Sequence, residues 1–454
     1  MARVTTIGTF AAQAALYIYS GLGSVVYPFS GPFLRARARR GKEDRERRAE
    51  RYGYPSWDRP NGPLVWLHAA SVGESLAIMP LIERMESFGI NLVLTTGTVT
   101  SAAIVEKRVS KLTIHQYVPM DVGRAVRRFL DHWQPDLAIF AESEIWPATI
   151  RELSKRDIPQ VLVNARMSDR SNERWQKRPA LARAIFRHLS QVIAQSELDG
   201  ERFRNLGAPW VSVAGNLKVD VGMPVANEKE VATMVQSLGK RPRWVAVSTH
   251  DGEEALAAEV HKMVRAHAPG LLSIIVPRHP DRADQIRKVL EEHGLVVVTR
   301  SSGEPVEEAT DVLLGDTIGE MGFYLRLAPI AFMGKSLSAT GGQNPLEPAV
   351  VACAVLSGRH VENFRDTYQQ LLDGGGAKLV KDEKMLAAYV LHLLRNPNQL
   401  TAMRQASRAT VAKMSGALER TSKTLDPYIM PLRVKAGLER RTMEDVAQQA
   451  GQAK

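Results

Sequence analysis

The segment Leu64-Val-Trp-Leu-His-Ala-Ala-Ser-Val-Gly-Glu74 decides the fold. It opens with a short apolar run, Leu64–His68, and a helical pattern follows at Ser75–Ser87. A buried strand that passes through a glycine-bearing turn into a helix is typical of parallel α/β sheets. We therefore expect a β–α unit here, and we look for its repeats in the rest of the chain.

The same alternation recurs along most of the chain. In the first half it predicts strands at Leu64–His68, Asn91–Thr95, Ile114–Val118, Asp136–Phe140, Gln160–Val163, Gln191–Ala194 and Val211–Val213. A second series is predicted at Trp244–Ser248, Leu272–Val276, Val296–Thr299, Val312–Leu314, Ile330–Met333, Ala354–Leu356 and Leu379–Val380. Two such series of similar size predict the α/β architecture of GT-B glycosyltransferases, in which two doubly wound, Rossmann-like domains face each other across a cleft.

The composition is that of an ordinary globular protein and excludes several classes. With 44% hydrophobic and 24% charged residues, the 454-residue chain is neither collagen-like nor disordered as a whole. The single cysteine, Cys353, excludes an intramolecular disulfide framework and a cysteine-cluster metal site. Because it lies in an apolar run, we expect it to be a buried, inert thiol.

The N-terminal region combines an uncharged stretch with a basic one. Residues 4–34 carry no charged side chain, and residues 35–51 contain nine basic and four acidic residues. A cleaved signal peptide is disfavoured, because its positive charges precede the apolar run. A membrane-spanning helix and a helix lying in the membrane interface both remain open. Either would hold the protein at the cytoplasmic face of a membrane, since basic flanks stay in the cytoplasm and are attracted to anionic lipid.

These patterns divide the chain into five expected segments. They are a membrane anchor or interfacial helix at 1–34, a basic juxtamembrane linker at 35–60, a first domain at 61–221, a second domain at 228–425 and a tail at 426–454. For the basic linker, a solvated charged helix without a partner is the alternative.

Acidic and polar side chains follow several strands of the first half. Glu74 opens the helix after the first strand, and Glu142 and Glu144 follow another strand beside Trp146. The carboxyl ends of parallel strands share one edge of a sheet, so these carboxylates are candidates for acid–base chemistry. For Glu74, capping of the helix dipole is an equally good interpretation.

The strand ends of the second half are basic and rich in glycine. Glycine allows close backbone approach to a phosphate, and Arg and Lys supply positive charge. This combination predicts a nucleotide site for a sugar donor, with solvated turns and helix caps as the alternative. The candidate residues are Arg278, His279, Gly334, Lys335, Ser336, Asn344 and Glu347.

Other motifs are missing from the sequence. The run Ile330–Ser336 lacks the first glycine of a P-loop, and no Gly-x-Gly-x-x-Gly fingerprint follows a strand. None of the histidines has the spacing of metal ligands, so we expect neither a catalytic metal nor a cofactor. Basic and aromatic residues are not interleaved as in nucleic-acid-binding proteins, so we expect no nucleic-acid partner.

Six ordered motifs together resemble the bacterial 3-deoxy-D-manno-octulosonic acid (Kdo) transferases of lipopolysaccharide assembly, from about residue 1 to 420. The motifs are His68–Glu74, Glu142–Pro147, Asn164–Ser168, Pro277–Pro280, Met333–Ser336 and Gly341–Pro348. The resemblance implies a metal-independent, inverting transfer of Kdo from CMP-Kdo to the lipid A precursor (lipid IVA), at the cytoplasmic face of the inner membrane. It makes the first domain the acceptor side and the second the donor-binding side.

The resemblance also implies roles for single residues. Glu74 is similar to the general base, and Glu142 and Glu144 resemble the acidic pair that supports the acceptor or the developing positive charge on the sugar. Arg278 and His279 are implied to hold CMP. In the same way, Gly334, Lys335 and Ser336 are implied to cradle the phosphate or carboxylate of the donor, and Asn344 and Glu347 to read the ribose. The family often has glycine where this chain has Lys335, and histidine where it has Gln343.

Two other interpretations stay open on the residues alone. One is a different GT-B transferase, such as an enzyme that adds a hexosamine to a lipid carrier. The other is a peripheral membrane-binding or nucleic-acid-binding protein whose basic stretch is the functional part.

Overall fold

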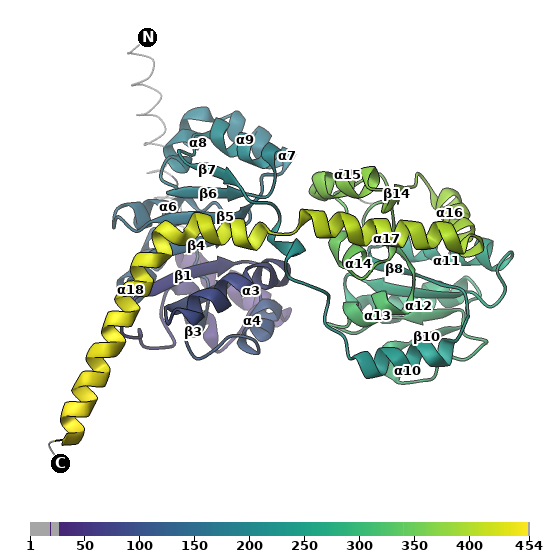
Figure 1. Ribbon diagram of the computed structural model, residues 1–454, viewed down its shortest axis with the longest axis horizontal. Coiled ribbons are helices and arrows are strands. Elements are labelled where there is room, and N and C mark those ends of the chain that lie inside the picture. Colours follow the sequence, from purple (N-terminus) through teal and green to yellow (C-terminus); the bar gives the residue numbers. More distant parts are fainter. Residues whose placement is uncertain (1–18, 20–26, 339, 453–454) are drawn as a thin grey trace, which may run out of the picture. The chain divides into compact units, whose positions relative to one another are not determined.

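In the part of the chain that the structure describes, fourteen strands form two parallel sheets of seven (Figure 1). The computed structural model describes residues 19, 27–338 and 340–452. The chain divides into one unit of Met1–Val221 with Gly416–Lys454 and a second unit of Gly222–Ser415, and each unit contains one sheet. All fourteen predicted strands are confirmed, with ends that shift by up to two residues.

The first sheet has the strand order β3-β2-β1-β4-β5-β6-β7, with every neighbouring pair parallel. Its strands are β1 (Leu64–Ala69), β2 (Asn91–Thr96), β3 (Thr113–Tyr117), β4 (Leu137–Ala141), β5 (Gln160–Ala165), β6 (Gln191–Ala194) and β7 (Val211–Val213). All residues of the central strands β1, β4 and β5 are buried. Parallel strands read as near-continuous apolar runs for this reason, because helices cover both faces.

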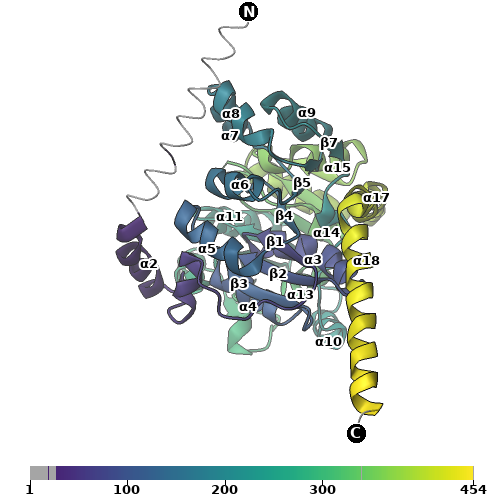
Figure 2. The same cartoon turned by 90° about the vertical axis from the view of Figure 1, so that its left-hand side faces the viewer.

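Helices cover both faces of the first sheet (Figures 1 and 2). Buried side chains of α3, α4 and α18 pack on one face, and those of α5, α6, α8 and α9 pack on the other. The helices of this unit are α2 (Ser30–Arg39), α3 (Val72–Ser87), α4 (Val99–Glu106), α5 (Gly123–Trp133), α6 (Pro147–Ser154), α7 (Asp169–Gln176), α8 (Pro179–Phe186), α9 (Glu197–Leu206) and α18 (Ala417–Gln452), with 3-10 turns η1 (Tyr27–Phe29), η2 (Arg47–Tyr52) and η3 (Leu217–Val219).

The last helix differs from the prediction, because α18 belongs to the first unit and not to the second domain or to a separate tail. Figure 2 shows it beside α3. Its apolar side chains recur at helical spacing and are buried in the core of the first sheet. They are Leu425, Ile429, Leu432 and Ala436. The predicted boundary at residue 425 is therefore wrong, and the first unit is completed by the end of the chain.

The start of α18 is fixed by Asp220, a residue that precedes the whole second unit in the chain. Asp220 accepts hydrogen bonds from the backbone N–H groups of Gly416 (2.9 Å) and Leu418 (2.6 Å). A carboxylate at a helix N-terminus satisfies orphan donors and favours the helix dipole. This long-range contact has no local sequence signal, which explains why the boundary was misplaced.

The second sheet has the order β10-β11-β9-β8-β12-β13-β14 and is also parallel throughout. Its strands are β8 (Arg243–Thr249), β9 (Leu272–Pro277), β10 (Val297–Thr299), β11 (Val312–Leu314), β12 (Ile330–Met333), β13 (Ala354–Ser357) and β14 (Ala377–Leu379). Its helices are α10 (Glu228–Leu238), α11 (Glu253–Arg265), α12 (Ala283–Glu292), α13 (Met321–Leu327), α14 (Leu346–Val350), α15 (Arg365–Asp373), α16 (Glu383–Arg395) and α17 (Pro397–Met414). Cys353 is buried as predicted, and burial raises the pKa of its thiol to about 12.

The predicted membrane anchor at 1–34 lies mostly outside the described residues, which begin with Tyr19 and then continue from Tyr27. In the part of the chain that the structure covers, no helix has the length and hydropathy needed to cross a bilayer.

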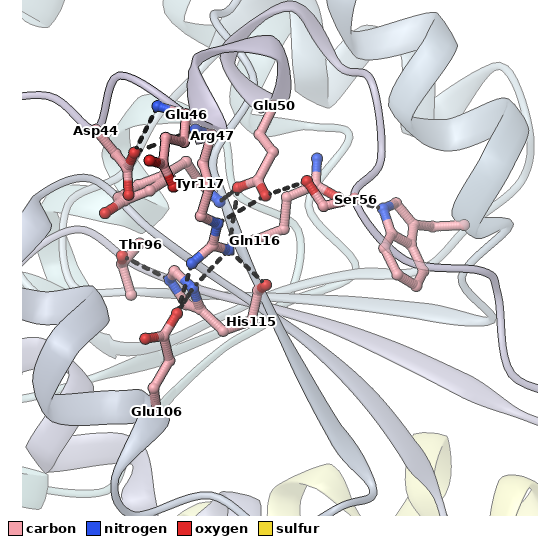
Figure 3. A network of polar contacts seen from close by, with 11 residues as sticks. Asp44, Glu46, Arg47, Glu50, Ser56, Thr96, Glu106, His115, Gln116 and Tyr117 are labelled. Carbon is pink, nitrogen blue, oxygen red and sulfur yellow. Dashed lines mark hydrogen bonds and ion pairs between the residues drawn. The ribbon is translucent and has the colours of Figure 1, made fainter.

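The predicted basic linker is instead folded onto the edge strand β3 (Figure 3). Glu50 is fully buried and accepts hydrogen bonds from Arg47 Nε (2.9 Å), the Ser56 hydroxyl (2.6 Å) and the Tyr117 backbone N–H (2.6 Å). Arg47 also donates to the His115 carbonyl (2.8 Å). The Glu50 carboxylate and the Arg47 guanidinium thus pair with each other and with backbone groups of the edge strand β3. Part of the charge of residues 35–60 is therefore buried and paired within the fold.

A second buried ion pair extends this attachment to the residues that follow β2 and β3. Arg51 is paired with Glu43 (3.0 Å), and both side chains are buried. The guanidinium of Arg51 also donates to the carbonyls of Gly97 (2.7 Å) and Val118 (3.2 Å). The segment after the uncharged stretch is therefore held rigidly against the carboxyl ends of β2 and β3.

Substitution of Glu50 should destabilise the first unit strongly. Glu50→Ala leaves Arg47 without its buried carboxylate and the Tyr117 N–H without an acceptor, and breaking such a pair costs about 3–5 kcal/mol. Urea denaturation, followed by the transition of the first unit, measures this change in the free energy of unfolding. The control is Glu46→Ala on the same segment, whose exposed side chain should change stability by less than about 0.5 kcal/mol. A Glu50→Ala variant as stable as this control would contradict the assignment.

Candidate functional site

The strand order of each sheet reverses at one point, which is where open α/β sheets bind ligands. In the first sheet the reversal lies between β1 and β4, since the chain continues from β1 to β2 on one side and from β4 to β5 on the other. In the second sheet it lies between β8 and β12. The predicted site residues follow β1, β4, β9 and β12, so most of them lie at the two reversal points.

Glu74 is fixed in the first turn of α3. The Ser71 hydroxyl donates to Oε1 of Glu74 (2.8 Å), and the Ala70 backbone N–H donates to Oε2 (2.8 Å). Ser71 is also the N-cap of the helix. Glu74 therefore does take part in capping the N-terminus of α3, as the alternative interpretation predicted. Burial, and then the negative charge of Glu142, raise the pKa of Glu74.

Glu142 and Glu144 lie in the loop after β4, close enough to Glu74 for their charges to interact. Glu142 forms an ion pair with Lys218 and has a left-handed backbone (φ +58°). Glu144 accepts a short hydrogen bond from the indole N–H of Trp146 (2.6 Å). Burial, and then the charge of Glu74, raise the pKa of Glu144 to about 7. The structure thus brings the three predicted carboxylates together.

His68, at the end of β1, lies beside Glu144 as a neutral imidazole. The imidazole is fully buried, and burial lowers its pKa to about 3, so the ring is neutral. Its Nδ1 lies within hydrogen-bond distance of the Thr95 carbonyl (3.0 Å) and the Thr95 hydroxyl (2.9 Å). Its Nε2 has no hydrogen bond among the described residues and lies 3.8 Å from Oε2 of Glu144. A neutral ring supplies no positive charge that would hold Glu144 ionised.

Lys218 was missed by the sequence analysis. It lies in η3, directly after β7, and its ion pair with Glu142 brings a cation to the carboxylates. Its place at the carboxyl end of a strand is the same signal that identified the glutamates. That signal was not applied to β7, a short and only partly buried strand.

A cationic cluster forms around His250 at the end of β8. The rings of His250 and His279 lie 5.9 Å apart, and Gln343 Nε2 is 3.1 Å from His250 Nε2. Burial, and then the charge of Lys335, lower the pKa of His250, with smaller effects from His279 and Arg278. Among the described residues, the ammonium of Lys335 has no hydrogen-bond acceptor. Arg278, His279 and Lys335 are therefore brought together as predicted.

The loop 334–336 differs from the predicted phosphate cradle. The backbone N–H groups of Lys335 (2.6 Å), Ser336 (3.0 Å) and Leu337 (3.3 Å) donate to the carboxylate of Glu253, in the first turn of α11. The Ser336 hydroxyl is buried and donates to the Met333 carbonyl (2.5 Å). These donors already have acceptors within the chain, so Ser336 organises the loop.

The backbone of this loop is sterically restricted at Gly334 and Lys335. A Cβ at Gly334 would lie 2.4 Å from the Ser248 carbonyl oxygen, so only glycine allows the loops after β8 and β12 to approach. Lys335 has φ +56°, a conformation that favours glycine. Among the described residues, the Lys335 side chain is the one hydrogen-bond donor of the predicted cradle, residues 334–336, that has no acceptor within the chain.

Asn344 and Glu347 lie at the start of α14. The Asn344 side chain accepts a hydrogen bond from the Leu346 N–H (3.2 Å). The preceding turn is pinned to the loop after β12, because the Gly342 N–H donates to the Lys335 carbonyl (3.0 Å). Glu347 lies exposed in the first turn. In the described part of the chain, no group of three or more His, Cys, Asp or Glu side chains is arranged to hold a metal ion.

Comparison with known proteins identifies the family. The family described as "3-Deoxy-D-manno-octulosonic-acid transferase (kdotransferase)" matches residues 46–221. The 3-deoxy-D-manno-octulosonic acid transferase of Haemophilus influenzae is 32% identical over 426 residues, which cover 91% of this chain and 98% of that protein. The chain belongs to this family. The Bordetella pertussis member is 34% identical over 80% of this chain and 87% of its own length.

Solved structures show that this member of the Kdo transferase family has a GT-B-type fold. A glycosyltransferase from Rickettsia africae aligns with a TM-score of 0.57 at 9% identity, over 82% of this chain and 99% of its own. The UDP-GlcNAc 2-epimerase of Neisseria meningitidis aligns with a TM-score of 0.55 at 14% identity, over 80% and 99%. The protein is therefore a glycosyltransferase of the Kdo transferase family, which decides against the hexosamine transferase.

Replacement of Glu144 should stabilise the protein in a pH-dependent way. Because its folded-state pKa is raised from 4.5 to about 7, the stability contributed by the protonated form is present below pH 4.5 and is lost as the pH rises to 7. Glu144→Gln stays neutral, so it should gain about 2 kcal/mol more stability at pH 8 than at pH 5. Urea denaturation at both pH values measures this difference. The exposed Glu173→Gln on α7 is the control, and an equal gain of the Glu144 variant at both pH values would contradict the assignment.

Proposed function

We propose that this protein transfers Kdo from CMP-Kdo to a lipid A precursor (lipid IVA) in lipopolysaccharide assembly, with inversion at the anomeric carbon. The observation that carries the proposal is the position of Glu74, a buried carboxylate at the strand reversal of the first sheet. Membership in the Kdo transferase family supports the donor and the reaction class.

Glu74 acts as the general base in this proposal. A hydroxyl group of the acceptor glucosamine gives its proton to Glu74 while its oxygen forms a bond to the anomeric carbon of Kdo. The bond from that carbon to the phosphate oxygen of CMP breaks, and CMP leaves with the electron pair. Attack from the face opposite to CMP inverts the configuration. The raised pKa makes Glu74 a stronger base, while Ala70 and Ser71 stabilise its ionised form.

Glu142 and Glu144 support this base in different ways. Glu142 is paired with Lys218 and places a carboxylate close to the sugar, where positive charge develops. Because its pKa is raised to about 7, Glu144 is partly protonated near neutral pH. It can therefore donate or accept a hydrogen bond with the acceptor substrate.

The second unit binds CMP in this proposal. Arg278, His279 and Lys335 place positive charge around His250, which suits the phosphate and carboxylate of the donor and the charge that CMP gains on leaving. Asn344 and Glu347 would read the ribose from the start of α14. With this charge supplied by side chains, the reaction proceeds without a metal ion or a cofactor.

Substitution of the base should separate chemistry from donor binding. Glu74→Gln should lower kcat about 10²–10⁴-fold, because the proton acceptor is lost. Mass spectrometry of the product from CMP-Kdo and lipid IVA measures the turnover, and isothermal titration measures CMP affinity, which should stay within about twofold. The matched variant Arg278→Ala should weaken CMP binding about tenfold or more, from loss of a charged hydrogen bond. Wild-type turnover in Glu74→Gln would overturn the role of Glu74.

We also propose that residues 1–34 and α2 hold the enzyme on the cytoplasmic face of the inner membrane. Phe29 at the end of η1 and Phe33 of α2 are 71% and 62% exposed, whereas Leu34 and Ala38 of α2 are buried. Arginines follow the exposed rings in the sequence, at positions 35, 37, 39 and 40, and the guanidinium of Arg37 lies over the Phe33 ring. Exposed aromatic rings with neighbouring cations are typical of helices that lie in an anionic membrane interface.

The exposed rings of Phe29 and Phe33, at the end of η1 and in α2, should contribute to membrane binding. Phe29→Ser together with Phe33→Ser should lower the partition into vesicles of phosphatidylglycerol and phosphatidylethanolamine about tenfold or more, because two apolar side chains lose their burial. Vesicle sedimentation measures the bound fraction. Trp210→Ser is the matched control, since Trp210 is equally exposed (68%) but lies on the loop before β7. Equal losses in both variants would contradict a specific role of α2.

A further inference from the structure

We propose that Glu253 is a positioning residue for donor binding, which holds the loop after β12 so that the ammonium of Lys335 meets the phosphate of CMP. The inference deepens the proposed function, because it rests on CMP binding by the second unit. It assigns a role to a buried carboxylate that binds backbone groups of the protein and acts on the donor through another residue.

The Glu253 carboxylate joins the two loops at the strand reversal of the second sheet. It lies in the first turn of α11, just after β8, and its side chain is buried. One oxygen accepts hydrogen bonds from the N–H groups of His250 (3.0 Å), after β8, and Lys335 (2.6 Å), after β12. The other accepts from the N–H groups of Ser336 (3.0 Å) and Leu337 (3.3 Å). Backbone N–H groups gathered around one anion form the kind of concavity that binds phosphate in many proteins.

Because an internal carboxylate fills this concavity, the loop presents a side chain to the donor in place of its backbone. Lys335 has a left-handed backbone (φ +56°), and no acceptor within the described residues pairs with its ammonium. Burial, and then the charge of Lys335, lower the pKa of His250, so the cation lies near this ring. The positive charge is therefore close to the reversal point, where open α/β sheets bind ligands.

The conformation of the loop depends on Glu253, because its other attachments hold carbonyl groups. The Lys335 carbonyl accepts a hydrogen bond from the Gly342 N–H (3.0 Å), and the Ser336 carbonyl accepts one from the His360 N–H (3.2 Å). A positive φ at a residue other than glycine is costly and persists only where the surroundings enforce it. Without the carboxylate, three consecutive N–H groups of the loop lose their acceptor, and the turn can relax.

A fixed loop matters for affinity, because lysine has a long and flexible side chain. A cation that is held in place before binding loses less conformational freedom when the phosphate arrives. An ammonium that meets a phosphate also forms a charged hydrogen bond, which is stronger than a neutral one. Glu253 should therefore increase the affinity for a nucleotide that carries a phosphate, and it should have little effect on the nucleoside alone.

Titration with CMP and with cytidine, followed by NMR, tests this inference. Glu253→Ala should weaken CMP binding about tenfold and leave cytidine affinity within about twofold, since cytidine has no phosphate. Lys335→Met should show the same selective loss. The double variant should bind CMP at most about twofold more weakly than Lys335→Met, because Glu253 acts through Lys335. Glu259→Ala, on the solvent side of the same helix, is the control and should change neither affinity.

Thermal unfolding shows which variants are folded, and Glu253→Gln, which keeps one acceptor oxygen, replaces an alanine variant that is not. Equal losses for CMP and cytidine in a folded variant would mean a general structural role and would overturn the inference. Additive losses in the double variant would also overturn it, as would tighter CMP binding without Glu253, which would mean that the carboxylate competes with the phosphate. A wild-type protein that does not bind CMP would refute the proposed function instead, so the two failures are distinguishable.

Discussion

Parallel pairing of strands is the constraint on which the rest of this structure depends. It buries both faces of each sheet under helices, and it brings the carboxyl ends of all strands in a sheet to one edge. At the reversal points, neighbouring loops diverge and leave their side chains accessible to one another. Residues at these ends adopt backbone conformations that are unfavourable elsewhere, as Glu142, Asn164, Ser248 and Lys335 do with positive φ.

The two edges carry opposite charge, and each is balanced by its own means. In the first unit, Lys218 pairs with Glu142, burial raises the pKa of Glu144 to about 7, and the neighbouring His68 imidazole is neutral. In the second unit, the Glu253 carboxylate takes the backbone donors of the loop after β12, which leaves the Lys335 side chain as the cation. The proposed base and the proposed anion-binding surface have opposite electrostatic needs, and separate sheets meet both.

Much of this could be predicted from local sequence, because apolar runs and their periodicity identified every strand. Strand ends identified the three glutamates and the cations around His250. The rest depends on contacts between distant segments. Lys218 acquires its meaning only when η3 meets β4, and Glu253 only when α11 meets the loop after β12. The basic segment was expected to be a linker because sequence does not show that Arg47 and Arg51 have buried carboxylates.

The return of α18 to the first sheet has a consequence for biosynthesis. Because the second unit is inserted between Val221 and Gly416, the ribosome completes one Rossmann-like unit while the other still lacks its final helix. Part of the apolar face that receives Leu425, Ile429 and Leu432 stays uncovered during that interval. Nascent chains of this protein therefore expose an apolar surface until α18 has been synthesised, which is the kind of surface that chaperones bind.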